Sequence, residues 1–155
     1  MSFFSKRIFL IAEAGINHNG CLKEAFKLVD AAKKNGADAI KFQTYITEKR
    51  VSKDSPIFKI LKKCELSFKD FFLLKKYCDK KKIIFFSTPF DKESVNFLNS
   101  LKVKLFKVAS FDISNYELIN EIVKTKKPTI ISTGMATLKE ISKVYNIFKK
   151  KKVDL

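Results

Sequence analysis

The sequence predicts an α/β protein built as an incomplete (βα)8 TIM barrel, with about five βα units and parallel strands. Short apolar runs alternate with longer segments whose apolar residues recur three and four positions apart, and no hairpin turn joins neighbouring runs. Strands that alternate with helices in this way pair in parallel through right-handed crossovers. At 155 residues the chain is long enough for one domain with a hydrophobic core.

Apolar runs rich in Ile, Phe and Val predict the strands, and each ends at glycine, proline or a polar residue. In chain order, the expected strands cover residues 8–12, 39–44, 83–87, 105–109 and 129–132. The final residues, Val153–Leu155, resemble the beginning of a sixth strand.

Helical spacing predicts a helix after each strand, at about 22–32, 71–78, 95–101, 118–123 and 138–148. Four of these helices have a residue that can accept a hydrogen bond from the first turn. The expected caps are Ser67 with Asp70, Asp91, Ser114 with Glu117, and Thr137 with Glu140. Residues 45–67 lack helical spacing, except for a short helix near 57–64, and are expected to form a long loop of the kind that often covers a site.

Both an open doubly wound sheet and a barrel could be built from these units. No G-x-G-x-x-G follows the first strand, which weakens the dinucleotide-binding version of the open sheet. Polar residues at the carboxyl end of every expected strand favour a barrel mouth. These residues are Glu13, Lys41, Gln43, Ser87, Thr88, Lys107, Ser110, Ser132 and Thr133.

Lys41 is unusual because it lies in the middle of an apolar strand. A buried ammonium group without a partner costs several kcal/mol or loses its proton, so we expect an anion beside it. Lys107 occupies a matching position two strands later. Two lysines with hydroxyl groups nearby form a combination that binds phosphate or a phosphorylated carboxylate.

Glu13 and His18 each have a structural and a functional interpretation. Glu13 could cap a loop, but close to two lysines it would stay ionised and could orient a water molecule or accept a proton. His18 lies between two asparagines, where it either holds the turn through a hydrogen bond or takes part in the site.

Composition narrows the class of protein. The formal charge of +16 comes almost entirely from lysine, with Arg7 and Arg50 as the only arginines, and it is spread along the chain. This pattern is typical of solvated surfaces and argues against a nucleic-acid partner, although a non-catalytic basic binding module remains an alternative. The three cysteines show no C-x-x-C spacing, and a single histidine excludes a site with two imidazole ligands in this chain. Without a long apolar segment or a leader-like start, we expect a cytoplasmic protein and no membrane span.

Five stretches, in order, resemble the N-acetylneuraminate (sialic acid) synthase family, which includes the legionaminic and pseudaminic acid synthases. They are Ile11–Gly20 (IAEAGINHNG), Gly36–Thr44 (GADAIKFQT), Phe86–Asp91 (FSTPFD), Phe106–Ser110 (FKVAS) and Ser132–Met135 (STGM). They extend over nearly the whole chain at spacings similar to those of the family.

The resemblance implies a TIM barrel that uses a divalent metal, Mn or Mg, to condense phosphoenolpyruvate with an N-acetylated, N-acetylmannosamine-like sugar. The products would be a nonulosonic acid and phosphate. Glu13 matches the carboxylate near the reacting carbons, and Gln43 and Asp112 match positions that face the sugar. The positions that match those holding phosphoenolpyruvate are Lys41, Thr88, Lys107, Ser110 and Ser132.

Some features of the family are not found in these 155 residues. Sialic acid synthases often carry glutamate where Asp112 stands, so the resemblance does not fix which sugar is the substrate. Their metal-binding histidines lie on later strands, so no metal ligand is expected in this chain. Their C-terminal antifreeze-like domain, which completes the partner's site in a homodimer, follows the barrel. We therefore expect residues 1–155 to form the N-terminal part of such an enzyme, inactive alone and prone to associate through open sheet edges. The alternative enzyme is another phosphoenolpyruvate-using carbon–carbon bond-forming barrel, such as a 3-deoxy-D-arabino-heptulosonate 7-phosphate synthase.

Overall fold

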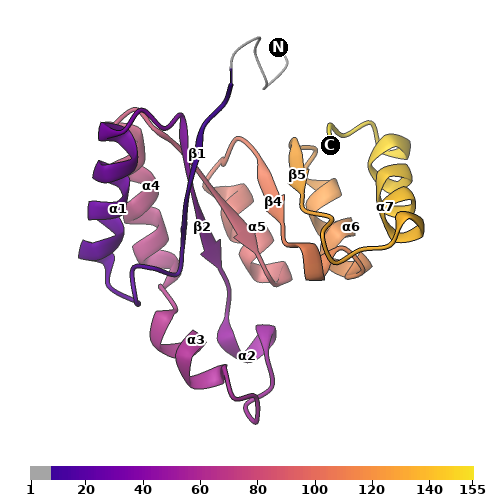
Figure 1. The fold of residues 1–155 in the computed structure, drawn as a ribbon, viewed down its shortest axis with the longest axis horizontal. Coiled ribbons are helices and arrows are strands. Elements are labelled where there is room, and N and C mark those ends of the chain that lie inside the picture. Colours follow the sequence, from indigo (N-terminus) through magenta and orange to yellow (C-terminus); the bar gives the residue numbers. More distant parts are fainter. Residues whose placement is uncertain (1–7) are drawn as a thin grey trace.

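A computed structural model, which describes residues 8–155, contains one sheet of five parallel strands in the order β1-β2-β3-β4-β5 (Figure 1). The strands are β1 Ile11–Gly15, β2 Ala39–Thr44, β3 Ile84–Pro89, β4 Phe106–Val108 and β5 Thr129–Ile131. The helices are α1 Leu22–Lys34, α2 Thr47–Arg50, α3 Phe58–Cys64, α4 Phe68–Lys80, α5 Lys92–Ser100, α6 Tyr116–Lys124 and α7 Leu138–Lys150, with a 3-10 turn η1 at Ser110–Asp112. The predicted α/β class, with five βα units and parallel strands, is confirmed.

Strand boundaries differ most from the prediction at β1 and β3, because strand pairing, rather than hydropathy, sets them. β4 and β5 are two residues and one residue shorter than predicted. β1 begins at Ile11, where pairing with Ala39 starts, while Ile8 is 89% exposed. β3 continues through Thr88 and Pro89, which lie opposite the last residues of β2. The expectations for the first seven residues, including the absence of a leader, lie outside the described part of the chain.

Three of the four predicted caps are confirmed. Ser67 and Thr137 form complete capping boxes, and the Asp91 side chain accepts from the backbone of α5. The prediction that Ser114 caps α6 is wrong, because Asn115 accepts from Leu118 N at 3.1 Å. The preceding turn explains the difference. Asn115 N still donates to the Asp112 carbonyl at 3.0 Å, so the helix begins one residue later than expected.

The segment after β2 is more ordered than the loop that the sequence predicts. It contains α2, which the sequence analysis missed, and the expected short helix α3. Glu65 joins them, since Thr47 donates to its carboxylate through both the backbone N at 3.0 Å and the hydroxyl at 2.5 Å. Tyr45 adds a hydrogen bond of 2.9 Å to the Leu61 carbonyl. These contacts hold α2 beyond the carboxyl end of β2 (Figure 1).

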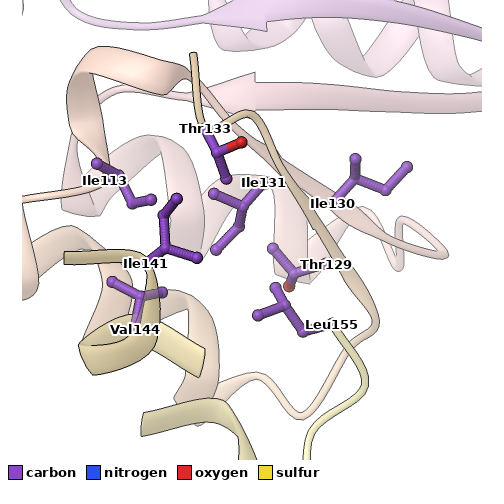
Figure 2. A pocket seen from close by; sticks show the side chains of 8 residues that line it. All are labelled: Ile113, Thr129, Ile130, Ile131, Thr133, Ile141, Val144 and Leu155. Atoms are coloured by element: carbon purple, nitrogen blue, oxygen red, sulfur yellow. The ribbon is translucent and has the colours of Figure 1, made fainter. Parts of the chain in front are cut away.

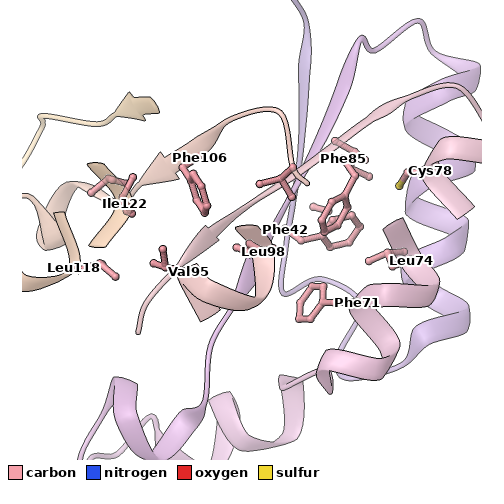
Figure 3. Close-up of a cluster of buried hydrophobic side chains, with 14 of the residues drawn as sticks. Phe42, Phe71, Leu74, Cys78, Phe85, Val95, Leu98, Phe106, Leu118 and Ile122 are labelled. Atoms are coloured by element: carbon pink, nitrogen blue, oxygen red, sulfur yellow. The ribbon is translucent and has the colours of Figure 1, made fainter. Parts of the chain in front are cut away.

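The two faces of the sheet have different surroundings. One face packs against the helices through the main hydrophobic core, part of which Figure 3 shows, including Phe42, Phe85 and Phe106. The other face carries a small apolar cluster made of strand residues and of Phe9 and Leu105, which flank strands. Along each strand this second face changes from apolar side chains to the predicted polar ones toward the carboxyl end. It therefore corresponds to the inside of a barrel.

Within the described sheet, the two edge strands each pair on one side only: β1 pairs with β2, and β5 pairs with β4. Beside β5 lies a hollow of about 310 Å³ lined mainly by isoleucines, Val144 and Leu155 (Figure 2). Residues 153–155, which resemble the beginning of a sixth strand, form no strand within residues 8–155, although Thr129 N at the start of β5 donates to the Asp154 carbonyl at 3.0 Å. No helix in that range is long and apolar enough to cross a membrane.

Candidate active site at the carboxyl ends of the strands

Lys41 forms the centre of the first group of polar residues. Its side chain is 8% exposed, and Nζ lies 2.7 Å from Glu13 Oε1 on β1 and donates to Thr88 Oγ1 on β3 at 3.2 Å. Strand register explains the arrangement, because Glu13 lies opposite Lys41 and Gln43 lies opposite Thr88. Glu13 supplies an anionic partner for Lys41, as the sequence analysis expected. The carboxylate is 60% exposed, so the pair opens to solvent at the mouth.

Lys107 forms the second group, on β4. Its ammonium group donates to Ser132 Oγ and to the Val108 carbonyl, both at 2.6 Å. Burial lowers its pKa, the positive charge of Lys41 lowers it further, and Glu13 acts in the opposite direction. The two lysines therefore lie within electrostatic range of each other. Among residues 8–155, no carboxylate lies within ion-pair distance of Lys107, so this cation can accept an external anion.

Ser110 links the loops that follow β4 and β5. Its Oγ accepts a hydrogen bond from Met135 N at 2.7 Å. Because a hydroxyl both accepts and donates, the Ser110 proton stays available to a bound anion. Met135 follows the loop that contains Ser132, so Ser110 and Ser132 are held on adjoining segments.

Gln43 and Asp112, the predicted sugar-facing residues, lie around Arg50 of α2. Arg50 Nη1 donates to Gln43 Oε1 at 3.2 Å. Burial raises the pKa of Asp112 to about 6, while the Asn115 side chain and the Arg50 charge lower it. One carboxylate oxygen of Asp112, Oδ2, is buried and has no hydrogen-bond partner in the described structure. This part of the mouth can therefore offer both amide and carboxylate groups to a polar ligand.

Two polar residues near the mouth have structural roles. Ser87 points toward the helices and shares a buried hydrogen bond of 2.8 Å with Thr44, so its expected place at the mouth is wrong; its strand position alternates with that of Thr88. His18 is 1% exposed, and its Nδ1 accepts from Gly20 N at 3.1 Å. Burial lowers its pKa, with the Gly15 backbone partly opposing. His18 therefore fits the interpretation of a histidine that holds the turn.

The described residues do not form a metal site of their own. No group of three histidine, cysteine, aspartate or glutamate residues within 8–155 is arranged to hold a metal ion. Glu13 faces Lys41, and the only imidazole serves the turn at Gly20. Ligands for a divalent metal would have to come largely from other residues.

Arg50 is the site residue that the sequence analysis missed. From the sequence it is one of many scattered charges, and residues 45–67 are predicted to form a loop. A usable signal was present, because Arg50 is one of only two arginines in a lysine-rich chain and follows the strand of Lys41 closely. Guanidinium is planar and ammonium is not, so an arginine in such a composition suits stacking or directed hydrogen bonds.

Comparison with known proteins identifies the family. The sequence profile of the NeuB family matches residues 28–155. The chain belongs to the NeuB family. This NeuB-family chain is 42% identical over 151 residues to the N,N'-diacetyllegionaminic acid synthase of Legionella pneumophila, covering 88% of the chain and 42% of that protein. It spans less than half the length of the curated relatives it matches.

Solved structures agree with this membership. The N-acetylneuraminic acid synthetase of Leptospira borgpetersenii, crystallised with citrate, matches the NeuB-family chain with a TM-score of 0.92 and 40% identity, over 96% of this chain and 52% of that one. A truncated 3-deoxy-D-arabino-heptulosonate 7-phosphate synthase from Thermotoga maritima matches with a TM-score of 0.70 at 12% identity, over 94% of this chain and 48% of that one. The second likeness shows a shared fold only.

Proposed function

We propose that the protein containing this chain condenses phosphoenolpyruvate with an N-acetylated amino sugar of the N-acetylmannosamine type, giving a nonulosonic acid and phosphate. The observation that carries the proposal is the pair of cations Lys41 and Lys107 on the inner face, with the hydroxyl groups of Thr88 and Ser132 beside them. Phosphoenolpyruvate carries a phosphate and a carboxylate, and two cations with oriented donors match both charges. Kinship with a legionaminic acid synthase supports the choice of reaction.

In the proposed reaction, the C2–C3 π electrons of phosphoenolpyruvate form a bond from C3 to the aldehyde carbon of the sugar. The C=O π bond of the aldehyde breaks, its oxygen takes up a proton and becomes a hydroxyl, and C2 becomes an oxocarbenium carbon. Water then adds to C2 and gives up a proton. The C2–O bond to phosphate breaks, the added hydroxyl loses its proton, and a 2-keto acid remains. Glu13 is suited to accept the proton from water, because its carboxylate is exposed at the mouth and lies 2.7 Å from the Lys41 ammonium group. Lys41, Lys107 and Ser110 would hold the anionic substrate throughout.

The proposal includes a divalent metal, Mn or Mg, and a homodimer. The metal would act as a Lewis acid on the sugar aldehyde. Gln43 and Asp112 would face the sugar, and the chain would supply the N-terminal part of the barrel. Later strands and an antifreeze-like domain would lie elsewhere in the protein, along with the metal ligands.

Phosphate release tests the proposed function. The protein, in the longest form that its gene encodes, is expected to release phosphate from phosphoenolpyruvate only when N-acetylmannosamine or a related N-acyl sugar and Mn²⁺ are present. One 2-keto acid should form per phosphate. The 155 residues alone are expected to bind phosphoenolpyruvate without releasing phosphate. Absence of turnover by the longer protein with every N-acyl amino sugar tried would contradict the proposal.

The same assay separates the alternatives. Turnover with erythrose 4-phosphate in place of the amino sugar would indicate the heptulosonate-type synthase, with which the chain shares only its fold. A basic binding module would instead bind nonspecific RNA with strong salt dependence, and replacing Lys41 and Lys107 would not change that binding.

Lys107 makes the affinity for phosphoenolpyruvate depend on pH. Since burial and Lys41 lower its pKa, part of the Lys107 population is neutral at a pH below the usual range for lysine. An anion favours the charged form, so binding is expected to take up protons, and affinity is expected to fall as pH rises through the lowered pKa. Calorimetry at alkaline pH in buffers of different ionisation enthalpy measures this uptake. The uptake should disappear in Lys107→Met, and equal uptake by the variant would contradict the assignment.

A further inference from the structure

Arg50 turns from the end of α2 back toward the mouth of the sheet. Its guanidinium lies 3.7 Å from the ring centre of Phe90 and 4.6 Å from that of Tyr45. Phe90 in turn stacks on Phe111, with ring centres 5.8 Å apart and planes at 12°. Arg50 is therefore fixed by segments that follow β2, β3 and β4. A lysine could not reproduce this arrangement, because its ammonium group lacks a plane to stack.

The contact between Arg50 and Gln43 determines which end of the glutamine amide, the oxygen or the nitrogen, points toward Arg50. Guanidinium has only donors, so Gln43 must present Oε1 to it; the flipped amide would bring two donors together. The opposite end, Nε2, then lies next to β1. A Cβ atom built on Gly15 would be 3.8 Å from Gln43 Nε2 and 3.9 Å from Glu13 Oε1. The free N–H groups of Gln43 thus border the same small space as the Glu13 carboxylate.

We propose that Arg50 is a positioning residue that makes Gln43 a donor only, so that the site selects a substrate with an acceptor oxygen at this point. The proposal rests on the proposed function and names the substrate group as the carbonyl oxygen of an N-acyl substituent. A sugar with a free amine would present a cationic donor to the Gln43 N–H groups and leave them unpaired. A polar group that loses its water on substrate binding and gains no partner is a strong basis for rejection.

The pKa of Asp112 provides a measure of the Arg50 charge that does not depend on turnover. The Arg50 charge and the Asn115 side chain both oppose the effect of burial on the pKa of Asp112, which is about 6. Removing the Arg50 charge is therefore expected to raise that pKa further. A variant that keeps the charge should leave it nearly unchanged, even when the stacking is lost.

The test compares Arg50→Met and Arg50→Lys with the control Lys49→Met, in the longest form of the protein. Lys49 is the neighbouring cation on α2, about half exposed, and it pairs with Glu93 away from Gln43. In Arg50→Met, the KM for N-acetylmannosamine is expected to rise about tenfold. The ratio of kcat/KM for N-acetylmannosamine to that for mannosamine is expected to fall about tenfold. The KM for phosphoenolpyruvate should stay within about twofold, which also shows that the variant folds.

Arg50→Lys is expected to show the same loss of discrimination with an unchanged Asp112 titration, measured by carboxyl carbon NMR, whereas Arg50→Met raises the Asp112 pKa. Lys49→Met should change neither quantity. Wild-type turnover with undiminished discrimination in both Arg50 variants would overturn the inference while leaving the proposed function intact. Absence of turnover by the wild type with any N-acyl amino sugar would instead overturn the proposed function, and with it this inference.

Discussion

Lys41→Met is expected to lower kcat/KM for phosphoenolpyruvate about 1,000-fold, which corresponds to ~4 kcal/mol of transition-state stabilisation. The reason is that Lys41 is almost completely buried and its ammonium group joins Glu13 and Thr88 at the centre of the proposed anion site. Methionine fills a similar volume but carries no charge. The effect would be measured by phosphate release under limiting phosphoenolpyruvate, with direct binding followed by calorimetry.

The folded state should tolerate this substitution. Removing one partner of a buried ion pair is costly when the other charge stays buried, but the Glu13 side chain left behind is 60% exposed and can be solvated. Lys27→Met is the matched control, because Lys27 forms an ion pair of similar length, 2.8 Å to Glu24, on the surface of α1. The control should keep wild-type activity. If Lys41→Met bound phosphoenolpyruvate as tightly as the control, the assignment of Lys41 to the substrate would be wrong.

Gly20→Ala is expected to destabilise the protein by ~3 kcal/mol, although residue 20 touches no proposed substrate position. Gly20 has a φ of +73°, and a Cβ built there would lie 2.1 Å from the Lys63 carbonyl oxygen. The left-handed backbone costs about 1–2 kcal/mol for a residue with a Cβ, and the clash with a backbone atom adds about 1–3 kcal/mol. Thermal or urea unfolding of the variant measures the loss.

Gly36→Ala separates the two contributions. Gly36 also has a positive φ, +82°, but no atom beyond its chain neighbours lies within 4 Å of a Cβ built there. It should therefore lose only the ~1–2 kcal/mol of backbone strain. Equal stability of the two variants would show that the loop containing Gly20 and the end of α3 separate easily, contrary to the close packing in the structure.

The positions of Lys41, Gln43 and Thr88 on one face could be predicted because they depend on a local rule. Side chains alternate along a strand, and the carboxyl ends of parallel strands meet at one edge. The same rule assigns Ser87 to the other face, whereas proximity to the strand end alone suggests a place at the mouth. The cap of α6 depended on a finer detail, since the hydrogen bond from Asn115 N to Asp112 delays the helix by one residue.

Arg50 marks the limit of prediction from the sequence. Its contacts with Phe90 and Gln43 require the path of the segment after β2, which the hydrogen bonds of Glu65 and Tyr45 determine across sixteen to eighteen residues of chain. The hydrophobic periodicity of the sequence does not predict contacts of this kind. The pKa of Asp112 likewise depends on how deeply the folded chain buries it and on the charge of Arg50, which lies far from it in sequence.

The sequence by itself determined the alternation of strands and helices, the pair of lysines on the inner face and the family motifs, because hydrophobic period and strand alternation act over a few neighbouring residues. Only the tertiary structure decided which side chains meet. In the folded chain Lys41 pairs with Glu13, and Lys107 donates to Ser132. Ser87 faces the helices, and Arg50 donates to Gln43. These contacts follow from strand register and from the packing of loops, in which the free energy depends on residues far apart in the chain.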